Sequence, residues 1–75
     1  MNDDIKPYTT RSGAQQYKPS LRLLQELSDD MLGFCLACGD ASTAAEPDCR
    51  KGTCDACGAP KVYGAEELAL MGLCF

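Results

Sequence analysis

The sequence predicts a small α+β fold that is stabilised by a metal ion, and three observations lead to this prediction. The chain has 75 residues, which is short for a domain that relies on a hydrophobic core alone. Large apolar side chains are scarce, because the sequence contains no Trp, two Phe and three Tyr. Six cysteines are present, and four of them form two Cys-x-x-Cys pairs. Since chains of this size usually need disulfides, a metal or oligomerisation, the cysteines are the natural stabilising groups.

The cellular compartment decides between disulfides and a metal. The first residues, Met1 to Pro7, lack the basic start and the apolar stretch of a secretory signal, so we expect a cytoplasmic protein. Thiols stay reduced in the cytoplasm, which favours metal binding by closely spaced cysteines. No run of about 18 apolar residues occurs, so no membrane span and no membrane partner are expected.

The charge pattern does not favour nucleic acid as the first choice of partner. The net charge is −4, from eleven acidic and seven basic residues. The basic residues do not form a stripe of the kind that binds a phosphate backbone without sequence preference. A mildly acidic surface also keeps a small domain in solution, so it identifies no other partner by itself.

Residues 1–19 are expected to form a flexible N-terminal arm. This segment contains prolines, glycine and polar residues, and shows neither the period of a strand nor that of a helix. Its tyrosines, Tyr8 and Tyr17, are candidates for docking onto the domain or onto a partner.

Residues 20–33 are predicted to form an amphipathic helix. Ser20 is a suitable N-cap, and Gly33 is placed to end the helix. A competing cap at Ser28 leaves a break into two shorter helices as an alternative. Apolar residues recur at helical spacing on one face, namely Leu21, Leu24, Leu27 and either Met31 or Leu32.

The leucine stripe of this helix has two interpretations. The simpler one is packing against the rest of the domain, and the sharper one is a partner-binding face formed by Leu21, Leu24 and Leu27.

Residues 34–64 form the central unit, and residues 65–75 a C-terminal helix and tail. Within the central unit we expect a loop at 40–47, a strand at 48–53 and a short strand at 61–63. Residues 65–71 are good helix formers with acidic side chains in the first turn, where the helix dipole favours them. Gly72 is expected to stop this helix.

The chemistry is concentrated in Cys35, Cys38, Cys54 and Cys57, which follow the pattern C-x2-C-x15-C-x2-C. A gap of two residues lets one tight turn present both thiolates of a pair to the same ion. A glycine follows each pair and permits the positive φ that brings backbone N–H groups toward the sulfurs. The pattern predicts one structural Zn²⁺ in a zinc ribbon, with two Cys-x-x-Cys knuckles on short β-hairpins between the two helices.

Other uses of these cysteines are less favoured. Iron in the same four-sulfur cage would give redox chemistry, but the aromatic residues that usually surround such a site are few. A catalytic dithiol needs only one Cys-x-x-Cys motif. Four cysteine ligands leave no open position for water, and the sequence has no His, so we expect no enzyme activity.

Two cysteines remain outside this set. In an extended 48–53 segment, side chains alternate, so Cys49 would point away from the face that carries Cys54. We therefore expect Cys49 and Cys74 to be free thiols rather than ligands.

The wider sequence resembles a family of small bacteriophage and prophage zinc-ribbon proteins. The resemblance covers about residues 33–70 and rests on the strings GFCLACG, EPDCR, CDACG and VYGAEEL. It implies the same four metal ligands and the role of a phage accessory protein, and it implies no activity. The family usually has alanine at the position of Cys49, which is a further reason to exclude this residue as a ligand.

Two functions follow as expectations. The first is a non-catalytic protein-interaction module that engages a host or phage protein, for example one of the transcription or replication machinery. The second is a nucleic-acid-binding ribbon, in which Arg50, Lys51 and Lys61 contact the nucleic acid with help from basic and aromatic residues of the arm. These arm residues are Arg11, Tyr17 and Lys18.

Overall fold

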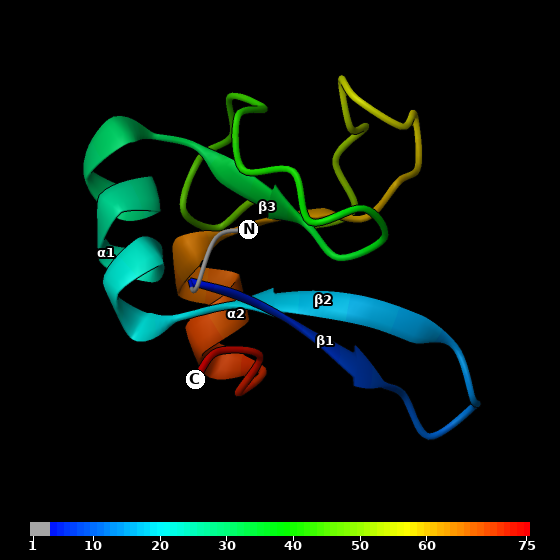
Figure 1. Cartoon of the computed structure of the whole chain (residues 1–75). Helices are drawn as coiled ribbons and strands as arrows, with labels where there is room; N and C mark the ends of the chain where they lie inside the picture. Colours follow the sequence, from blue (N-terminus) through cyan, green and yellow to red (C-terminus); the bar gives the residue numbers. More distant parts are fainter. Residues whose placement is uncertain (1–3) are drawn as a thin grey trace.

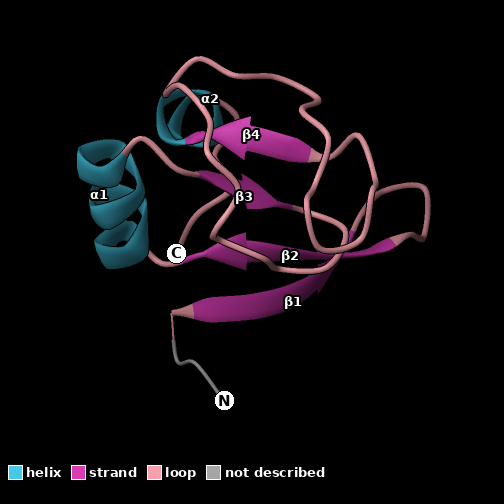
Figure 2. Ribbon diagram, turned by 90° about the horizontal axis from the view of Figure 1, so that it is seen from above, coloured by secondary structure: helices cyan, strands magenta, loops and turns pink. Residues whose placement is uncertain are grey.

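Two pairs of antiparallel strands and two short helices make up the fold in the computed structural model, which describes residues 4–75 (Figure 1). The elements in chain order are β1 Ile5–Thr9, β2 Gln15–Pro19, α1 Leu21–Asp30, β3 Gly33–Cys35, β4 Val62–Gly64 and α2 Ala65–Leu70. Figure 2 shows the four strands side by side, with the helices gathered at one end of them. The 26-residue connection between β3 and β4 carries three of the four paired cysteines, and the fourth ends β3.

The segment expected to be a flexible arm is a β-hairpin instead. β1 and β2 pair in register from Ile5 opposite Pro19 to Thr9 opposite Gln15. The hairpin also joins the rest of the fold, because the Tyr17 N–H donates to the Leu36 carbonyl at 2.9 Å. The prediction is therefore wrong for residues 4–19, and residues 1–3 of the arm lie outside the described part of the chain.

The strand pattern of this hairpin is hard to read because each strand contains a proline and few apolar residues. Ile5 and Tyr17 pack against the core, whereas Lys6 and Lys18 face each other across the strands. Pro19 is fully buried as well, but proline is disfavoured inside strands, so these three residues do not make a recognisable period-2 pattern. The pairing of β1 with β2 is stabilised by tertiary contacts, which cannot be predicted from the local sequence.

Helix α1 begins where the sequence predicts and ends earlier. Ser20 is the N-cap, and its Oγ accepts a hydrogen bond from the Leu23 N–H at 3.1 Å. The C-cap is Met31, which is left-handed with φ 55°, so the helix stops before Gly33. Gly33 belongs to β3, where a Cβ would lie 2.5 Å from the Val62 side chain. The predicted break at Ser28 is not seen.

Replacing Ser20 with alanine should lower the free energy of unfolding by about 1 kcal/mol, because the first turn of α1 loses its cap. The Ser20 hydroxyl also donates to Asp4 at 2.8 Å, which ties the start of the hairpin to the helix. Chemical denaturation of the metal-loaded chain measures the change, and Ser12→Ala in the exposed hairpin turn is the matched control. Equal effects of the two substitutions would contradict the capping role.

The hydrophobic core lies between the two helices and the strands. α1 packs against α2, and α2 directly follows β4. The buried residues of this core are Leu23, Leu24, Leu27, Phe34, Leu36, Ala65 and Leu68. Ile5 and Tyr17 of the hairpin add partly buried side chains. The core is small but continuous, and it draws on every part of the described chain except the second cysteine loop.

The leucine stripe of α1 is mainly a packing face. Leu24 and Leu27 are buried in the core, so the packing interpretation is the right one for both. Leu21 is 61% exposed, and Leu23 takes the inward position that the predicted stripe gave to Leu21. Both assignments fit a helical period, so spacing alone did not separate them.

The connection between β3 and β4 is mostly turns. The predicted strand at 48–53 is wrong, because Gly52 makes only an isolated bridge to Val62 and Lys51 has a left-handed φ of 51°. The strand predicted at 61–63 is found one residue later, as β4. The predicted C-terminal helix is confirmed as α2, and Gly72 follows it with φ 71°.

No helix within residues 4–75 is long and apolar enough to cross a membrane.

Candidate metal centre

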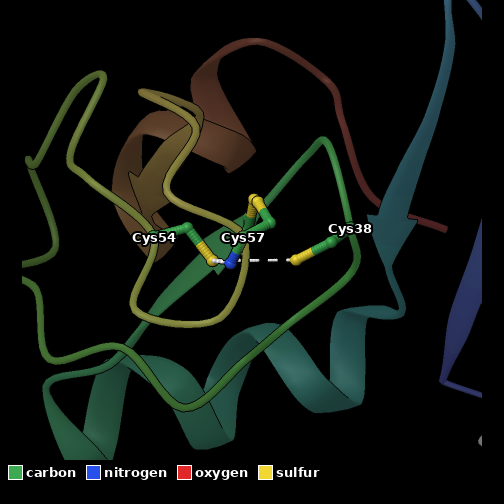
Figure 3. A group of neighbouring side chains, drawn as sticks. Cys38, Cys54 and Cys57 are labelled. Carbon is green, nitrogen blue, oxygen red and sulfur yellow. Dashed lines mark hydrogen bonds between the residues drawn. The ribbon is translucent and has the colours of Figure 1, made fainter.

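The four paired cysteines meet at one place, as the sequence predicts. The Sγ atoms of Cys35, Cys38, Cys54 and Cys57 all lie within 4.8 Å of one another. The Sγ atoms of Cys38 and Cys54 are 3.6 Å apart (Figure 3). Those of Cys35 and Cys57 are 3.7 Å apart. A tetrahedral ion with bonds of about 2.3 Å to sulfur separates its ligands by ~3.8 Å. The cluster therefore has the size of a four-sulfur metal site.

Disulfide bonds do not explain this cluster. The short sulfur–sulfur distances of 3.6 and 3.7 Å are far longer than the ~2.05 Å of a covalent bond. They also connect cysteines of different pairs rather than the two members of one Cys-x-x-Cys motif. The arrangement is that of four separate thiols around a common centre, which is compatible with a single structural metal ion.

The two Cys-x-x-Cys turns have the same backbone geometry. In the first, the Gly39 N–H donates to the Cys35 carbonyl at 2.8 Å, and in the second the Gly58 N–H donates to the Cys54 carbonyl at 2.9 Å. The amide of each leading cysteine in turn donates to a carbonyl five residues later, that of Asp40 or Ala59. The chain thus builds the same sulfur-presenting turn twice.

Glycine after each pair serves this turn, as the sequence predicts. Gly39 has φ 81° and Gly58 has φ 76°, a region that side chains with a Cβ rarely adopt. Open space surrounds Gly58, whereas a Cβ on Gly39 would touch Tyr17 and Ile5 at ordinary contact distance. The requirement for glycine at both positions is therefore conformational and not steric.

Backbone amides favour the charged form of the Cys54 sulfur. Its Sγ accepts hydrogen bonds from the N–H groups of Cys57 at 3.4 Å and Ala56 at 3.3 Å. The Cys57 bond comes first among the causes that lower the pKa of Cys54 to about 6. This sulfur is thus prepared as a thiolate, which is the form that binds a metal.

In the first cysteine turn, desolvation is the main influence on the pKa values of the two thiols. Burial raises the pKa of Cys35, although the amides of Cys38 and Ala37 act in the opposite direction. Cys38 is exposed as a residue, but its sulfur lies among the other sulfurs, and desolvation raises its pKa to about 12. The neighbouring sulfurs add to the rise. Four thiolates at this distance repel one another, so a cation is required for all of them to be charged together.

The cluster is buried on one side and open on the other. Cys35 and Cys54 are the inner pair, and they pack with Val62 of β4 and with Ala45. Cys38 and Cys57 are the outer pair and are exposed. The inner pair anchors the site to the β3–β4 sheet, so any ion held there connects the sheet to both cysteine turns.

A small polar network, which the sequence analysis did not identify, joins the two cysteine turns. The Asp55 N–H donates to Thr43 Oγ1 at 3.2 Å, and that hydroxyl donates to Asp40 at 3.3 Å. Asp40 also accepts from the amide and hydroxyl of Ser42, and the Ser42 hydroxyl is the main cause that lowers the pKa of Asp40. The run of Asp, Ser and Thr in residues 40–43 is typical of such side-chain turns and was the available signal.

Acid should release the metal and unfold the protein in one transition. Protons compete with the metal for thiolates, so affinity falls as the pH falls. The pKa of Cys54 is lowered from 9.0 to about 6, so the stability that its thiolate provides is complete only above pH 9, declines as the pH falls, and is lost as the pH passes through about 6. Metal content and far-ultraviolet circular dichroism should therefore decline together below that pH. Unfolding at a clearly higher pH than metal loss would contradict the coupling.

The remaining predicted site residues are not part of the cluster. Arg50 forms an ion pair with the buried Glu67, with Nε and Oε1 2.6 Å apart. Lys51 is exposed and Lys61 is partly buried. The Cys49 thiol faces the Val62 carbonyl at 3.9 Å, and Cys74 packs against the core near the C-terminus. Neither of these two thiols belongs to the group of four.

The fold and the site together define a small α+β protein with a cluster of four cysteines that is compatible with a bound metal ion. Comparisons with protein-family models, with curated proteins and with solved structures find no match. The interpretation of the site therefore rests on its own geometry.

Proposed function

We propose that the four cysteines hold one Zn²⁺ and that the chain is a zinc ribbon acting as a non-catalytic protein-interaction module. The observation that carries this proposal is the cluster of four sulfurs within 4.8 Å, presented by two matching turns. Zinc suits the site because it accepts four thiolates in a tetrahedron and has no redox chemistry of its own. Its role is to fix the loop between β3 and β4, which has little hydrophobic core.

Iron is the main competitor for the same four sulfurs. Protein produced without added metal and purified without chelator should be colourless and contain one zinc per chain by elemental analysis. Strong visible absorption together with one iron per chain would show that the metal is iron and not zinc. That result would favour electron transfer over a structural role.

A non-catalytic role agrees with the ligand set and with the composition. Four cysteine ligands complete a tetrahedral site, so water has no position at which a metal could activate it. The sequence has no His, which is the commonest general base. Metal binding would therefore stabilise the conformation of the loop between β3 and β4, and the surface of that loop is available to a partner.

The partner is proposed to be a host or phage protein, in a cytoplasmic setting, and the machinery of transcription or replication is the first place to look. The resemblance of residues 33–70 to phage zinc-ribbon proteins supports this proposal. An affinity pull-down from host lysate, with the zinc-loaded chain and with the chelated chain as bait, tests it. Partners retained only by the zinc-loaded chain would support the module, and identical retention by both baits would contradict it.

Nucleic acid binding is a second candidate function, because the β1–β2 hairpin carries basic and aromatic side chains. Residues 5–19 contain three basic residues and no acidic one. Lys18 lies over the Tyr8 ring at 5.5 Å, which places a cation and an aromatic ring together. Basic and aromatic groups of this kind bind single strands. Arg50, which we first expected to contact nucleic acid with Lys51 and Lys61, is already paired with Glu67. A salt-dependent mobility shift with short single-stranded DNA or RNA would support this candidate, and no shift at low salt would end it.

A further inference from the structure

A shallow apolar groove lies between α1 and α2, outside the metal centre. Its volume is about 180 Å³, and it is lined by Leu24, Gln25, Ser28, Ala65, Glu66 and Ala69. Leu24 and the two alanines supply its apolar surface, and the other three residues supply polar groups. Because Ala65 and Ala69 are one helical turn apart, α2 presents two methyl groups along its side of the groove, with Glu66 beside them. An approaching helix could therefore come close to the α2 backbone.

Exposed apolar side chains are concentrated around the same two helices. In the described part of the chain, every large hydrophobic residue that is exposed lies in α1, in α2 or just beyond one of their ends. These residues are Leu21, Met31, Leu70, Met71 and Phe75. Leu21 and Leu70 are the most exposed, at 61% and 79%. None of these five residues lines the groove itself, but their concentration at the two helices that form it indicates an interaction surface.

The net charge of the protein is concentrated on these helical segments. Residues 21–34 carry −2 and residues 65–75 carry −2, which together equal the net charge of the whole chain. The remaining segments, 1–20 and 35–64, cancel each other at +1 and −1. Arg22 of α1 is paired with Asp4, and Glu67 of α2 is buried and paired with Arg50. The exposed acidic residues of the two helices are Glu26, Asp29, Asp30 and Glu66. A partner for this surface must therefore bring positive charge around an apolar contact.

We propose that the groove between α1 and α2 binds a basic amphipathic helix of another protein. Leucine-like side chains at helical spacing would enter the groove against Leu24, Ala65 and Ala69, and flanking Lys or Arg would face Glu66 and the acidic residues of α1. This inference rests on the proposed interaction function and names its surface and the chemistry of its partner. A second copy of the chain fits less well, because it would bring two acidic helical surfaces together.

Two synthetic peptides provide the test. Both carry the same leucine stripe at helical spacing, and the polar positions are lysine in one and glutamate in the other. Fluorescence anisotropy with the zinc-loaded chain should show binding of the lysine peptide only, weakening as salt is added because exposed charges are screened. Equal binding of the two peptides, or no binding of the lysine peptide, would overturn the proposal.

Variants locate the binding site. Ala69 is exposed, so Ala69→Arg should fold normally while filling the groove and reversing its charge, and it should weaken binding by about tenfold or more. Ala14→Arg introduces the same side chain in the exposed hairpin turn and should leave binding unchanged. Glu66→Lys removes acidic charge without filling the groove and should cause a smaller loss. An unchanged affinity for Ala69→Arg would refute the groove as the site.

Two further measurements separate this inference from other outcomes. Sedimentation of the zinc-loaded chain alone should show a monomer, whereas a dimer that Ala69→Arg abolishes would assign the groove to a second copy and overturn the proposal. Zinc content and circular dichroism are measured on the same samples. A folded, zinc-loaded chain that fails to bind the lysine peptide refutes the groove and leaves the metal site standing, whereas absence of zinc refutes the proposed function itself.

Discussion

Excess chelator is expected to unfold the zinc-loaded protein, with loss of helical circular dichroism and of amide dispersion in nuclear magnetic resonance spectra. Structural zinc in small finger peptides contributes about 10–16 kcal/mol of apparent binding free energy at neutral pH. That amount is comparable to or larger than the total stability of about 5–15 kcal/mol that is usual for a whole domain. The cysteine turns have no other source of comparable stabilisation, because Cys38 and Cys57 are exposed.

Single ligand variants should reproduce the effect of the chelator. Cys54→Ser removes a buried ligand whose thiolate accepts two amide hydrogen bonds, and it should abolish tight zinc binding. Cys49→Ser and Cys74→Ser are the matched controls, since neither thiol belongs to the cluster, and both should keep one zinc per chain. A chelated chain that retains its native spectrum would show that the small core suffices without metal.

The second large effect is expected from Gly64→Ala, at a residue that is not one of the four clustered cysteines. A Cβ at this position would lie 2.1 Å from the Glu46 carbonyl oxygen and 2.3 Å from that of Pro47. Gly64 has φ −74°, which suits any residue, so the requirement for glycine is entirely one of space. Backbone atoms must move, and the loss should reach or exceed the upper end of the about 1–3 kcal/mol usual for overpacking.

Gly13→Ala separates this collision from conformational strain. Gly13 has φ 89° and open space around its Cβ position, so its cost is only that of a left-handed backbone, about 1–2 kcal/mol. Chemical denaturation of the zinc-loaded variants should therefore rank Gly64→Ala as clearly more destabilising. The reverse order would contradict the packing of the 46–47 segment against the start of α2.

The same packing explains how the connection between β3 and β4 is held without a strand. The Pro47 carbonyl accepts from the amides of Glu66 and Glu67 at 2.9 and 3.2 Å, and the Cys49 carbonyl accepts from the Gly64 amide at 2.9 Å. Backbone groups at the start of α2 are thereby satisfied by the loop. A strand is expected at 48–53 from the local sequence alone, which does not include these hydrogen bonds to residues far along the chain.

The candidate metal centre was predictable because its signal is local. Two Cys-x-x-Cys-Gly motifs each specify a turn through spacing and through a residue that tolerates positive φ, and the structure brings all four sulfurs together. The Ser20 cap and the end of α2 near Gly72 are likewise local features, and they were located correctly.

The parts that sequence reasoning missed depend on tertiary contacts. The β1–β2 hairpin is held by a bond from Tyr17 to Leu36 and by the chain end, where the Phe75 N–H donates to the Pro19 carbonyl at 3.0 Å. The choice of Leu23 over Leu21 as an inward residue depends on where α2 lies. The residues that contact the hairpin and helix α1 lie far away in the sequence. Hydrophobic periodicity within a short segment therefore could not assign these positions.

X-ray absorption spectroscopy at the zinc edge, on protein purified without added metal, tests the central proposal most directly. The predicted result is one zinc per chain with four sulfur ligands at about 2.3 Å and no nitrogen or oxygen ligand. A chain that contains no bound metal, or a metal with fewer than four sulfur ligands, would contradict it.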